Sequence, residues 1–215
     1  MEQTNLNTRY QTKDQTYLKW KKRIDAVLCI VALIVLSPLL FAIALIIKCS
    51  NWKAPIFFKQ KRVGKNGISF DMYKFRTMHE DAEAQLEKYL EKNEIEGAMF
   101  KLKNDPRVTK FGRLLRKTSL DEFPQLWNVV KGDMALVGPR PPLQREVAEY
   151  TTHDKQRLVI TPGCTGLWQV SGRNELSFKE MVELDLRYIQ RVSFGLDFKI
   201  MCKTVLVMLL PKGAY

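Results

Sequence analysis

Cysteine is scarce and scattered in this chain of 215 residues. The four cysteines are Cys29, Cys49, Cys164 and Cys202, and no two of them form a Cys-x-x-Cys pair. The sequence therefore lacks the spacing of a zinc site or a disulfide framework. Two of the four lie in or beside apolar runs, which is typical of reduced, inert thiols in a cytoplasmic compartment.

Acidic residues are outnumbered, with 23 Asp and Glu against 35 Lys and Arg, so the net charge is +12. This balance indicates a phosphate-bearing partner, such as nucleic acid, anionic lipid or a nucleotide. Zinc-finger spacing, the aromatic RNA-binding submotif and a basic zipper are all missing, and we therefore expect no nucleic-acid partner. A non-catalytic basic scaffold on an anionic membrane surface remains an alternative to an enzyme.

A signal-peptide h-region is missing from residues 1–17, which are polar and aperiodic and predict a tail. The apolar run comes later, from Ala26 to Ile47, with Ser37 as the only polar member of its 22 residues. A straight helix of that length rises about 33 Å and would cross a bilayer core. Length alone therefore favours a simple transmembrane anchor.

Two features argue against a simple span. Pro38, in the middle of the run, removes a backbone donor, and the neighbouring Ser37 hydroxyl is able to help satisfy a freed carbonyl. Basic residues also flank both ends, which places both ends on the cytoplasmic side. We therefore predict a re-entrant helix, broken at Ser37-Pro38, over residues 18–52. Trp20 and Trp52 would lie at the interface, and Arg23 and Asp25 are close enough in sequence to pair.

The next segment, residues 55–78, predicts a β-hairpin around Gly64-Lys65-Asn66-Gly67. The alternation of Ile68, Phe70 and Met72 favours a strand with one buried face. Residues 74–78 (KFRTM) fit a basic edge strand and a ligand contact about equally well. Residues 79–103 are highly charged and predict a solvated helix without chemistry.

Residues 118–142 (TSLDEFPQLWNVVKGDMALVGPRPP) contain the strongest functional pattern. They predict a helix from Leu120 to Lys131 that is apolar nearly all round, with Ser119 as its N-cap and Pro124 in its first turn. Its one polar line has the i, i+4, i+7 spacing of a single helical face and consists of Asp121, Gln125 and Asn128. Such a stripe usually faces something polar, although acidic residues at a helix start are also ordinary.

Three features follow toward the C-terminus. Residues 161–174 (TPGCTGLWQVSGRN) hold three glycines, which let backbone N–H groups approach a ligand, and Arg173, which can fork onto a phosphate. Asp185 lies at the centre of an apolar helical face, and we favour a structural partner for it over a site. Residues 198–210 are too short to span a membrane but are amphipathic enough to lie at its surface.

The segment SLDEFPQLWNVVKGDMALVGPRP, together with KNDPR before it and PGCTGLWQVSGRN after it, resembles the monotopic phosphoglycosyl transferases, which are bacterial sugar transferases. The resemblance covers about residues 18–215. It implies an α+β fold, mostly α, with a Ser-Pro-broken re-entrant helix, interfacial amphipathic helices and a small β-hairpin. The expected organisation is a tail (1–17), the re-entrant helix (18–52) and a cytoplasmic catalytic domain (53–215) at the bacterial inner membrane.

The resemblance further implies transfer of a sugar 1-phosphate, with Mg²⁺, from a UDP-sugar to undecaprenyl phosphate, as the priming step of O-antigen, capsule or exopolysaccharide synthesis. Asp121 would be the nucleophile that briefly carries the phosphosugar, and Glu122 and Asp197 would hold the metal. The residues implied in substrate binding are Arg116, Pro139, Arg140, Pro141, Gln169 and Arg173. Galactose or glucose is the expected sugar, and the chain resembles the short form that has only the catalytic domain.

One departure from the family's pattern bears on the glycine loop. Thr161 stands where the family often has arginine, which removes one expected cationic contact but not the loop itself. Oligomeric state is not predicted by any feature of the sequence.

Overall fold

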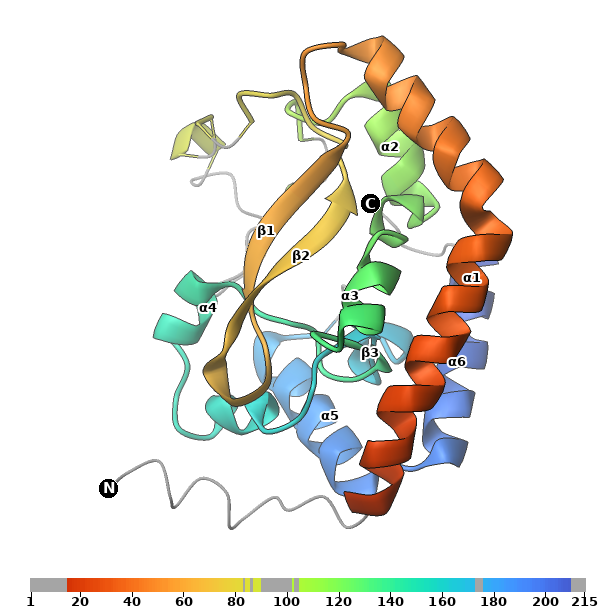
Figure 1. The fold of residues 1–215 in the computed structure, drawn as a ribbon. Coiled ribbons are helices and arrows are strands. Elements are labelled where there is room, and N and C mark those ends of the chain that lie inside the picture. Colours follow the sequence, from red (N-terminus) through yellow and green to blue (C-terminus); the bar gives the residue numbers. More distant parts are fainter. Residues whose placement is uncertain are drawn as a thin grey trace.

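The computed structural model describes residues 15–82, 84–85, 87–89, 102, 105–172 and 176–209. It has the mostly helical α+β fold expected from the sequence, with a long apolar N-terminal helix and small sheets (Figure 1). Arg173, one of the predicted phosphate ligands, lies outside the described residues.

Helix α1 (Gln15–Ser50) is continuous over 36 residues and carries Pro38 within it. Figure 1 shows the helix curving rather than separating into two elements. The Ser37 hydroxyl donates a hydrogen bond of 2.8 Å to the carbonyl oxygen of Ile34, the acceptor that Pro38 leaves without its usual N–H. The predicted help from Ser37 is thus confirmed, and it lets the helix continue through the proline.

Helix α1 is attached to the rest of the molecule along its length. Near its start, Lys21 contacts Asp197 at 2.5 Å and Asp25 at 3.1 Å, so Asp25 pairs with Lys21 rather than with Arg23. Near its end, Ile43 and Ile47 are buried in a cluster with Phe75 and Leu115. Because both halves pack against the same body, α1 lies along it.

A hairpin forms from β1 (Phe57–Val63) and β2 (Ser69–Phe75), joined through the 3-10 turn η1 (Lys65–Gly67), as the Asn-Gly pair predicted. Asn66 and Gly67 take the positive φ angles of 56° and 79° that this turn requires. Met72 is buried, but Ile68 is exposed because it precedes β2 in the turn region. Inside β2, Phe70 is only half-buried and Phe75 on the opposite face is buried, so the predicted alternation with one buried face is wrong.

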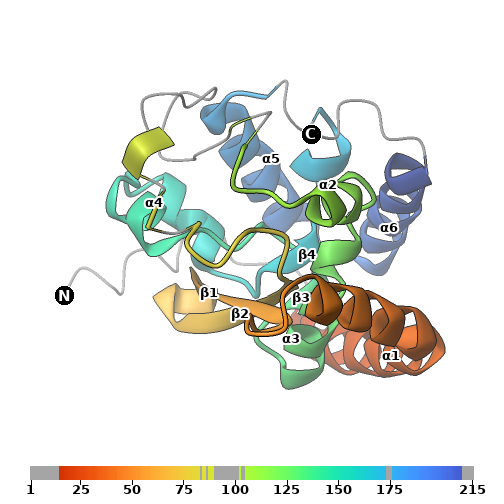
Figure 2. The ribbon, with the colours of Figure 1, turned by 90° about the horizontal axis from the view of Figure 1, so that it is seen from above.

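Helix α3 (Gln125–Lys131) lies between the hairpin and α1 (Figures 1 and 2). Its Asn128 is fully buried and donates to the carbonyl oxygen of Asp71 at 2.7 Å while accepting from the N–H of Tyr73 at 3.0 Å. The Asn128 amide thus pairs with a backbone C=O and a backbone N–H of β2, as the backbone of a neighbouring strand would. This part of the predicted polar stripe serves the fold.

A second, parallel pair joins β3 (Ala135–Val137) and β4 (Gly163–Thr165). A Cβ at Gly163 would lie 2.1 Å from the backbone nitrogen of Gly138, so glycine is required for this close approach. The N–H of Gly138 donates to Thr165 at 2.9 Å, and that of Gly163 donates to Pro139 at 2.8 Å. The glycines at these positions bring two turns of the protein together rather than a turn and a ligand.

The remaining elements complete the core. They are α2 (Lys110–Lys117), η3 (Leu120–Glu122), α4 (Gln144–Ala148), η4 (Asp154–Leu158), η5 (Trp168–Val170), α5 (Phe178–Arg191) and α6 (Phe194–Leu209). The helix predicted over residues 79–103 is wrong for its described part up to residue 89, which forms turns and a short 3-10 segment at 87–89. Most of the rest lies outside the described residues. Helix α6 runs beside the first part of α1 (Figures 1 and 2).

Asp185 has the structural partner that we favoured. Its carboxylate accepts a short hydrogen bond from Arg157, which also donates to the hydroxyl of Tyr150 at 3.1 Å. Burial raises the pKa of Asp185 to about 6, while the Arg157 guanidinium works in the opposite direction. This pair lies in the core beneath α5 and ties η4 to it.

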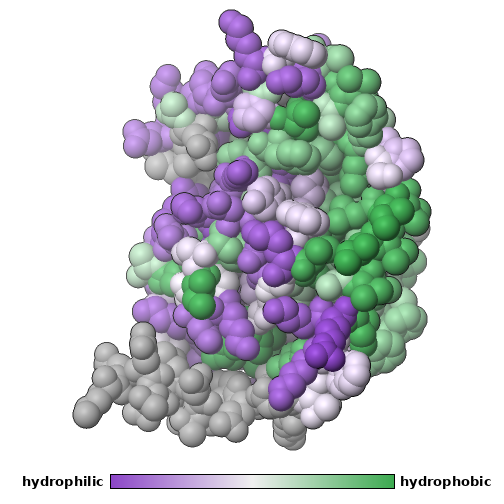
Figure 3. Space-filling model, in the orientation of Figure 1, coloured by the Kyte–Doolittle hydropathy of each residue, from purple (hydrophilic) through white to green (hydrophobic). Residues whose placement is uncertain are grey.

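An extensive apolar surface follows α1. In the described part of the chain, α1 is the one helix long and apolar enough to cross a membrane. Ile34, Val35 and Phe41 are 67%, 70% and 72% exposed. Figure 3 shows hydrophobic residues gathered over α1 and hydrophilic residues over the opposite side, around the hairpin and α4.

Candidate active site

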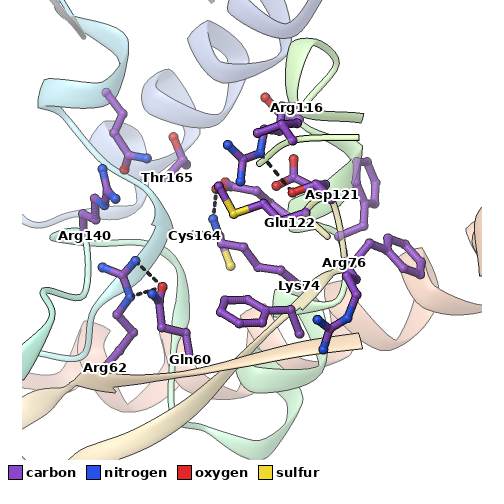
Figure 4. A pocket seen from close by; sticks show the side chains of 18 of the residues that line it. Gln60, Arg62, Lys74, Arg76, Arg116, Asp121, Glu122, Arg140, Cys164 and Thr165 are labelled. Carbon is purple, nitrogen blue, oxygen red and sulfur yellow. Dashed lines mark hydrogen bonds and ion pairs between the residues drawn. The ribbon is translucent and has the colours of Figure 1, made fainter. Parts of the chain in front are cut away.

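A cleft of about 1380 Å³ runs between the hairpin, α2, α4 and α6, with Asp121 and Glu122 among the residues that line it. Figure 4 shows these two carboxylates with Lys74, Arg116, Arg62 and Arg140 around them. The cationic side chains come from β2, α2, β1 and the turn after β3. The fold thus assembles the site from segments far apart in the sequence.

The predicted helix from Leu120 to Lys131 is interrupted, and Asp121 lies in its separated first turn. Residues Leu120–Glu122 form the 3-10 turn η3, and α3 begins only at Gln125. Pro124 precedes α3 as its N-cap, because a proline has no N–H to donate into a continuing helix. Ser119 makes no capping hydrogen bond and adopts a left-handed φ of 56°, so the predicted N-cap is wrong.

The two adjacent carboxylates differ in exposure. Asp121 is 7% exposed, whereas the side chain of Glu122 is 41% exposed and contacts the Lys74 ammonium at 2.6 Å. Burial raises the pKa of Asp121, with Glu122 adding to the effect and Lys74 and Arg116 opposing it. Glu122 also experiences desolvation, but Lys74, Arg140 and Arg62 hold its pKa below the ordinary value.

Arg116 lies where the resemblance implied a phosphate ligand. It lines the cleft, and its Nε donates to the hydroxyl of Thr77 at 3.0 Å, which fixes the guanidinium near the carboxylates. The segment 74–78 therefore supplies both the partner of Glu122 and the support of Arg116. The segment thus lines the cleft, and its role as a ligand contact stays a prediction.

Arg62 and Arg140 form a second group of positive charge. Arg62 donates to the carbonyl oxygen of Pro141 at 3.0 Å and to Gln60 at 2.6 Å. Burial and the neighbouring Arg140 lower the pKa of Arg62 to about 10. Both side chains line the cleft, and a planar guanidinium group suits phosphate oxygens.

The Gly-Pro-Arg-Pro-Pro turn presents one side chain to the cleft. Arg140 lines the cleft, whereas Pro139 and Pro141 are buried behind it and do not. The two prolines, implied in substrate binding, thus support Arg140 instead of lining the cleft themselves. Gln169, implied in the same role, does line the cleft.

Asp197 is not brought together with Glu122. It is 2% exposed and lies outside the lining of the cleft. Its carboxylate accepts hydrogen bonds from Lys21 at 2.5 Å, Tyr17 at 2.7 Å and Tyr188 at 2.8 Å. These contacts attach the start of α1 to α5 and α6, which is a structural task.

Several residues that line the cleft were not predicted from the sequence. Arg62 and Gln60 lie on β1, and the buried ion pair of Asp105 with Arg107, at 2.6 Å, borders the cleft. The sequence offered one indication for Arg62. It precedes Val63 at the end of β1 where the strand becomes buried. An arginine directed inward needs an anionic or carbonyl partner, and here it has Pro141.

The cleft has two chemically different ends. We call the polar arm the end lined by β1, α4 and the turn between β3 and α4, which comprises Gln60, Arg62, Arg140, Gln144, Arg145 and Glu146. We call the apolar wall the face of α6 that lines the other end, which comprises Met201, Val205 and Met208. The carboxylates of Asp121 and Glu122 line the same cleft as the polar arm and the apolar wall.

In the described part of the chain, no group of three or more His, Cys, Asp and Glu side chains is arranged to hold a metal ion. Glu122 and Asp121 offer two neighbouring carboxylates instead. That set fits Mg²⁺, which commonly takes one or two protein carboxylates and completes its shell with phosphate oxygens and water.

Comparison with known proteins gives the family. A family model described as bacterial sugar transferase matches residues 16–211. The galactosyl transferase CpsE of Streptococcus agalactiae is 46% identical over 200 residues, covering 93% of this chain and 44% of CpsE. The exopolysaccharide production protein ExoY of Sinorhizobium fredii is 41% identical over 199 residues, covering 91% of this chain and 88% of ExoY.

A third relative is longer than this chain. The undecaprenyl-phosphate galactose phosphotransferase of Salmonella typhimurium is 44% identical over 199 residues, covering 91% of this chain and 41% of that protein. The chain thus spans less than half the length of CpsE and of this enzyme, and most of the length of ExoY. The matched region includes every described element of the cleft. The chain belongs to the bacterial sugar transferase family, as its motifs indicated.

Proposed function

We propose that the protein transfers a sugar 1-phosphate from a UDP-sugar to undecaprenyl phosphate and thereby primes exopolysaccharide, capsule or O-antigen synthesis. The observation that carries this proposal is the buried Asp121 beside Glu122, set in a cleft whose lining is rich in Lys and Arg side chains. A diphosphate needs such a setting, because an anionic nucleophile approaches it only when the phosphate charge is neutralised. The name of the Salmonella relative contains undecaprenyl phosphate, which supports this acceptor.

The chemistry proceeds in two displacements. A carboxylate oxygen of Asp121 attacks the β-phosphorus of the donor, the bond to the bridging oxygen breaks, and UMP leaves. A phosphate oxygen of undecaprenyl phosphate then attacks the same phosphorus and releases the Asp121 carboxylate. Dividing one transfer into two steps lets a single cleft serve two large substrates in turn.

The cationic residues have separate tasks in these steps. Arg62 and Arg140 bind the nucleotide end of the diphosphate, and Arg116 opposes the charge that develops at the transferred phosphoryl group. Glu122 would hold Mg²⁺, which when bound neutralises diphosphate charge. Lys74 keeps the Glu122 carboxylate ionised by lowering its pKa.

Helix α1 is proposed to enter the membrane from the cytoplasmic side and return. Both of its halves pack against the same body, and its outward face is apolar. Arg23 lies over the ring of Trp20 at 5.6 Å and Lys48 over that of Trp52 at 5.5 Å, so each end carries an interfacial pair of cation and aromatic. A helix with these properties holds the cleft at the headgroup plane of the inner membrane.

The donor sugar is proposed to be galactose or glucose. Two of the three relatives described above are named for galactose. A screen of UDP-galactose, UDP-glucose and their N-acetylated forms, with the full chain in vesicles, would rank the donors. Turnover confined to the N-acetylated donors would contradict this assignment.

The two-step mechanism is tested with labelled donor alone. We expect incubation with UDP-hexose labelled in the sugar, together with Mg²⁺, to release UMP and leave a labelled adduct on Asp121 that undecaprenyl phosphate discharges. Asp121→Asn is expected to form neither the adduct nor the lipid product. Formation of lipid-linked sugar by Asp121→Asn would rule out the nucleophile, and a labelled lipid without any adduct on the wild-type chain would indicate direct transfer.

The membrane seating is tested separately. Cysteines introduced one at a time as Lys19→Cys and Lys53→Cys mark the two ends of α1. The background chain has Cys49, Cys164 and Cys202 changed to alanine and keeps only the buried Cys29. In intact cells we expect an impermeant maleimide to label neither position and to label both after the membrane is opened. Labelling of one end from outside would establish a span instead.

A further inference from the structure

One face of α6 is turned toward the cleft. Met201, Thr204, Val205 and Met208 are spaced i, i+3, i+4 and i+7, and all four line the cleft. The hydroxyl of Thr204 bonds with that of Thr165 on β4 at 2.7 Å. This bond occupies the polar group of the face and fixes the apolar wall next to the strand that supports Arg140.

The apolar wall shares the cleft with a basic lip. Arg113, Arg116 and Lys117 on α2 line the same cleft, and Arg113 and Lys117 are exposed. Seen from above, α2 and α6 lie on the same side of the molecule (Figure 2). A lip of cations with a hydrocarbon wall matches a ligand that has a phosphate at one end and a hydrocarbon chain at the other.

The volume leaves room for a second ligand. Pockets that enclose a drug-sized ligand are about 300–1,000 Å³, and the cleft measures about 1380 Å³. The sugar and diphosphate of a nucleotide sugar are polar and gain little from methionine and valine side chains, so the polar arm suits them better. The apolar wall is therefore available for another substrate.

The wall is also continuous with the apolar exterior. Phe198 and Leu206, on the outer side of α6, are 57% and 58% exposed and do not line the cleft. A hydrocarbon chain that leaves the carboxylates along α6 would pass Phe198 and Leu206, with the exposed Lys199 and Lys203 farther round the same helix.

We propose that Met201, Val205 and Met208 bind the first isoprene units of the polyprenyl phosphate acceptor, while Arg113 and Lys117 attract its phosphate. This inference rests on the proposed function, and it assigns the acceptor to the α6 end of the cleft and the donor to the polar arm. The isoprene chain and the nucleotide then lie at different ends of the cleft, while the acceptor phosphate enters the side of the phosphorus that UMP has left, because each displacement occurs in line and opposite Asp121.

The test compares two neighbouring residues of similar exposure. Val205 is 55% exposed and lines the cleft, whereas Leu206 is 58% exposed and faces outward. With the full chain in vesicles of phosphatidylethanolamine and phosphatidylglycerol, we expect Val205→Asn to raise the KM for undecaprenyl phosphate about tenfold. Leu206→Asn is expected to leave it within about twofold, and the donor KM is expected to stay constant in both.

Folding of each variant is checked by donor-only exchange of labelled UMP into UDP-hexose, and Val205→Thr supplies a nearly isosteric version with a smaller shift in the same direction. Equal acceptor KM values for Val205→Asn and Leu206→Asn would overturn the inference. Absence of exchange in the wild-type chain would instead overturn the proposed function.

A second measurement needs no variant. A farnesyl phosphate analogue with a benzophenone in place of its terminal isoprene unit is expected to label residues 201–208 of the wild-type chain, in competition with undecaprenyl phosphate. Labelling confined to α1, or equal labelling of α6 by a benzophenone phospholipid, would show that the wall contacts bulk lipid only.

Discussion

The polar arm and the apolar wall belong to one cleft but have opposite chemistry. In the polar arm, burial of Arg62, with Arg140 nearby, lowers the pKa of Arg62 to about 10. The apolar wall consists of aliphatic and thioether side chains on α6, and its one hydroxyl is bonded to β4. The difference teaches that each end is suited to one half of a transfer reaction, with the carboxylates of η3 available to both.

The largest expected effect comes from the residue that serves both ends. Asp121→Asn is expected to reduce lipid-linked sugar formation by about four orders of magnitude, because it removes the nucleophile while keeping the shape of the side chain. Both UMP exchange and product formation should fall together, as measured with radiolabelled donor. Asp71→Asn, a change of a surface carboxylate on the hairpin, is the control; loss of only one half-reaction in Asp121→Asn would contradict a shared intermediate.

A smaller effect, confined to the donor, is expected from the polar arm. Arg140→Gln should raise the donor KM by about tenfold, since a charged hydrogen bond to phosphate is lost. The acceptor KM should stay within error, which makes the change the mirror image of Val205→Asn. Arg191→Gln, on the exposed end of α5, controls for net charge. A rise in acceptor KM of the same size would break the division of the cleft into two ends.

The outward face of α1 should affect neither substrate directly. Val35→Asn is expected to lower partition of the protein into vesicles by about fivefold, because an exposed apolar side chain loses its transfer free energy into lipid. Donor-only exchange per molecule of bound protein should be unaffected. Thermal unfolding in detergent is measured alongside, and a large fall in Tm would mean that the residue packs in the core instead.

The smallest expected effect is a shift in pH dependence. The pKa of Asp121 lies above its ordinary value of 3.8 because of burial and the neighbouring Glu122. Activity should therefore fall as the pH drops through this raised pKa, since the protonated carboxyl is no nucleophile. Arg116 opposes the rise, so Arg116→Gln should move the acid limb of kcat to higher pH and Arg116→Lys should move it less. An acid limb that stays in place in Arg116→Gln would separate this residue from Asp121.

Much of the site was predictable from local patterns. The motif around Asp121 and Glu122 identified the carboxylates, and Asn-Gly identified the hairpin that carries Lys74. The partner of Asp185 was expected, but Arg157 as its identity was not, because sequence patterning says that a buried carboxylate needs a donor and not which one. We predicted a break in the helix at Ser37-Pro38, but α1 is continuous there. We also predicted one helix from Leu120 to Lys131, but it is interrupted before Gln125.

These two prolines differ in what surrounds them. At Pro38 the Ser37 hydroxyl satisfies the carbonyl that the proline leaves without a donor, so α1 continues. At Pro124 the chain instead turns Asp121 toward the cleft and starts a new helix. Propensity treats the two positions alike, and only the contacts made by their neighbours separate them.

By itself, the sequence determined the apolar run of α1, the hairpin, the paired carboxylates and the membership in a family, because each of these depends on residues close together along the chain. Only the tertiary structure decided that Lys74 and Arg116 flank those carboxylates, that Asp197 fastens α1 rather than lining the cleft, and that a face of α6 closes the other end. The physical reason is distance along the chain. Contacts between residues tens of positions apart depend on how whole elements pack. The spacing of residues close together in the sequence does not determine that packing.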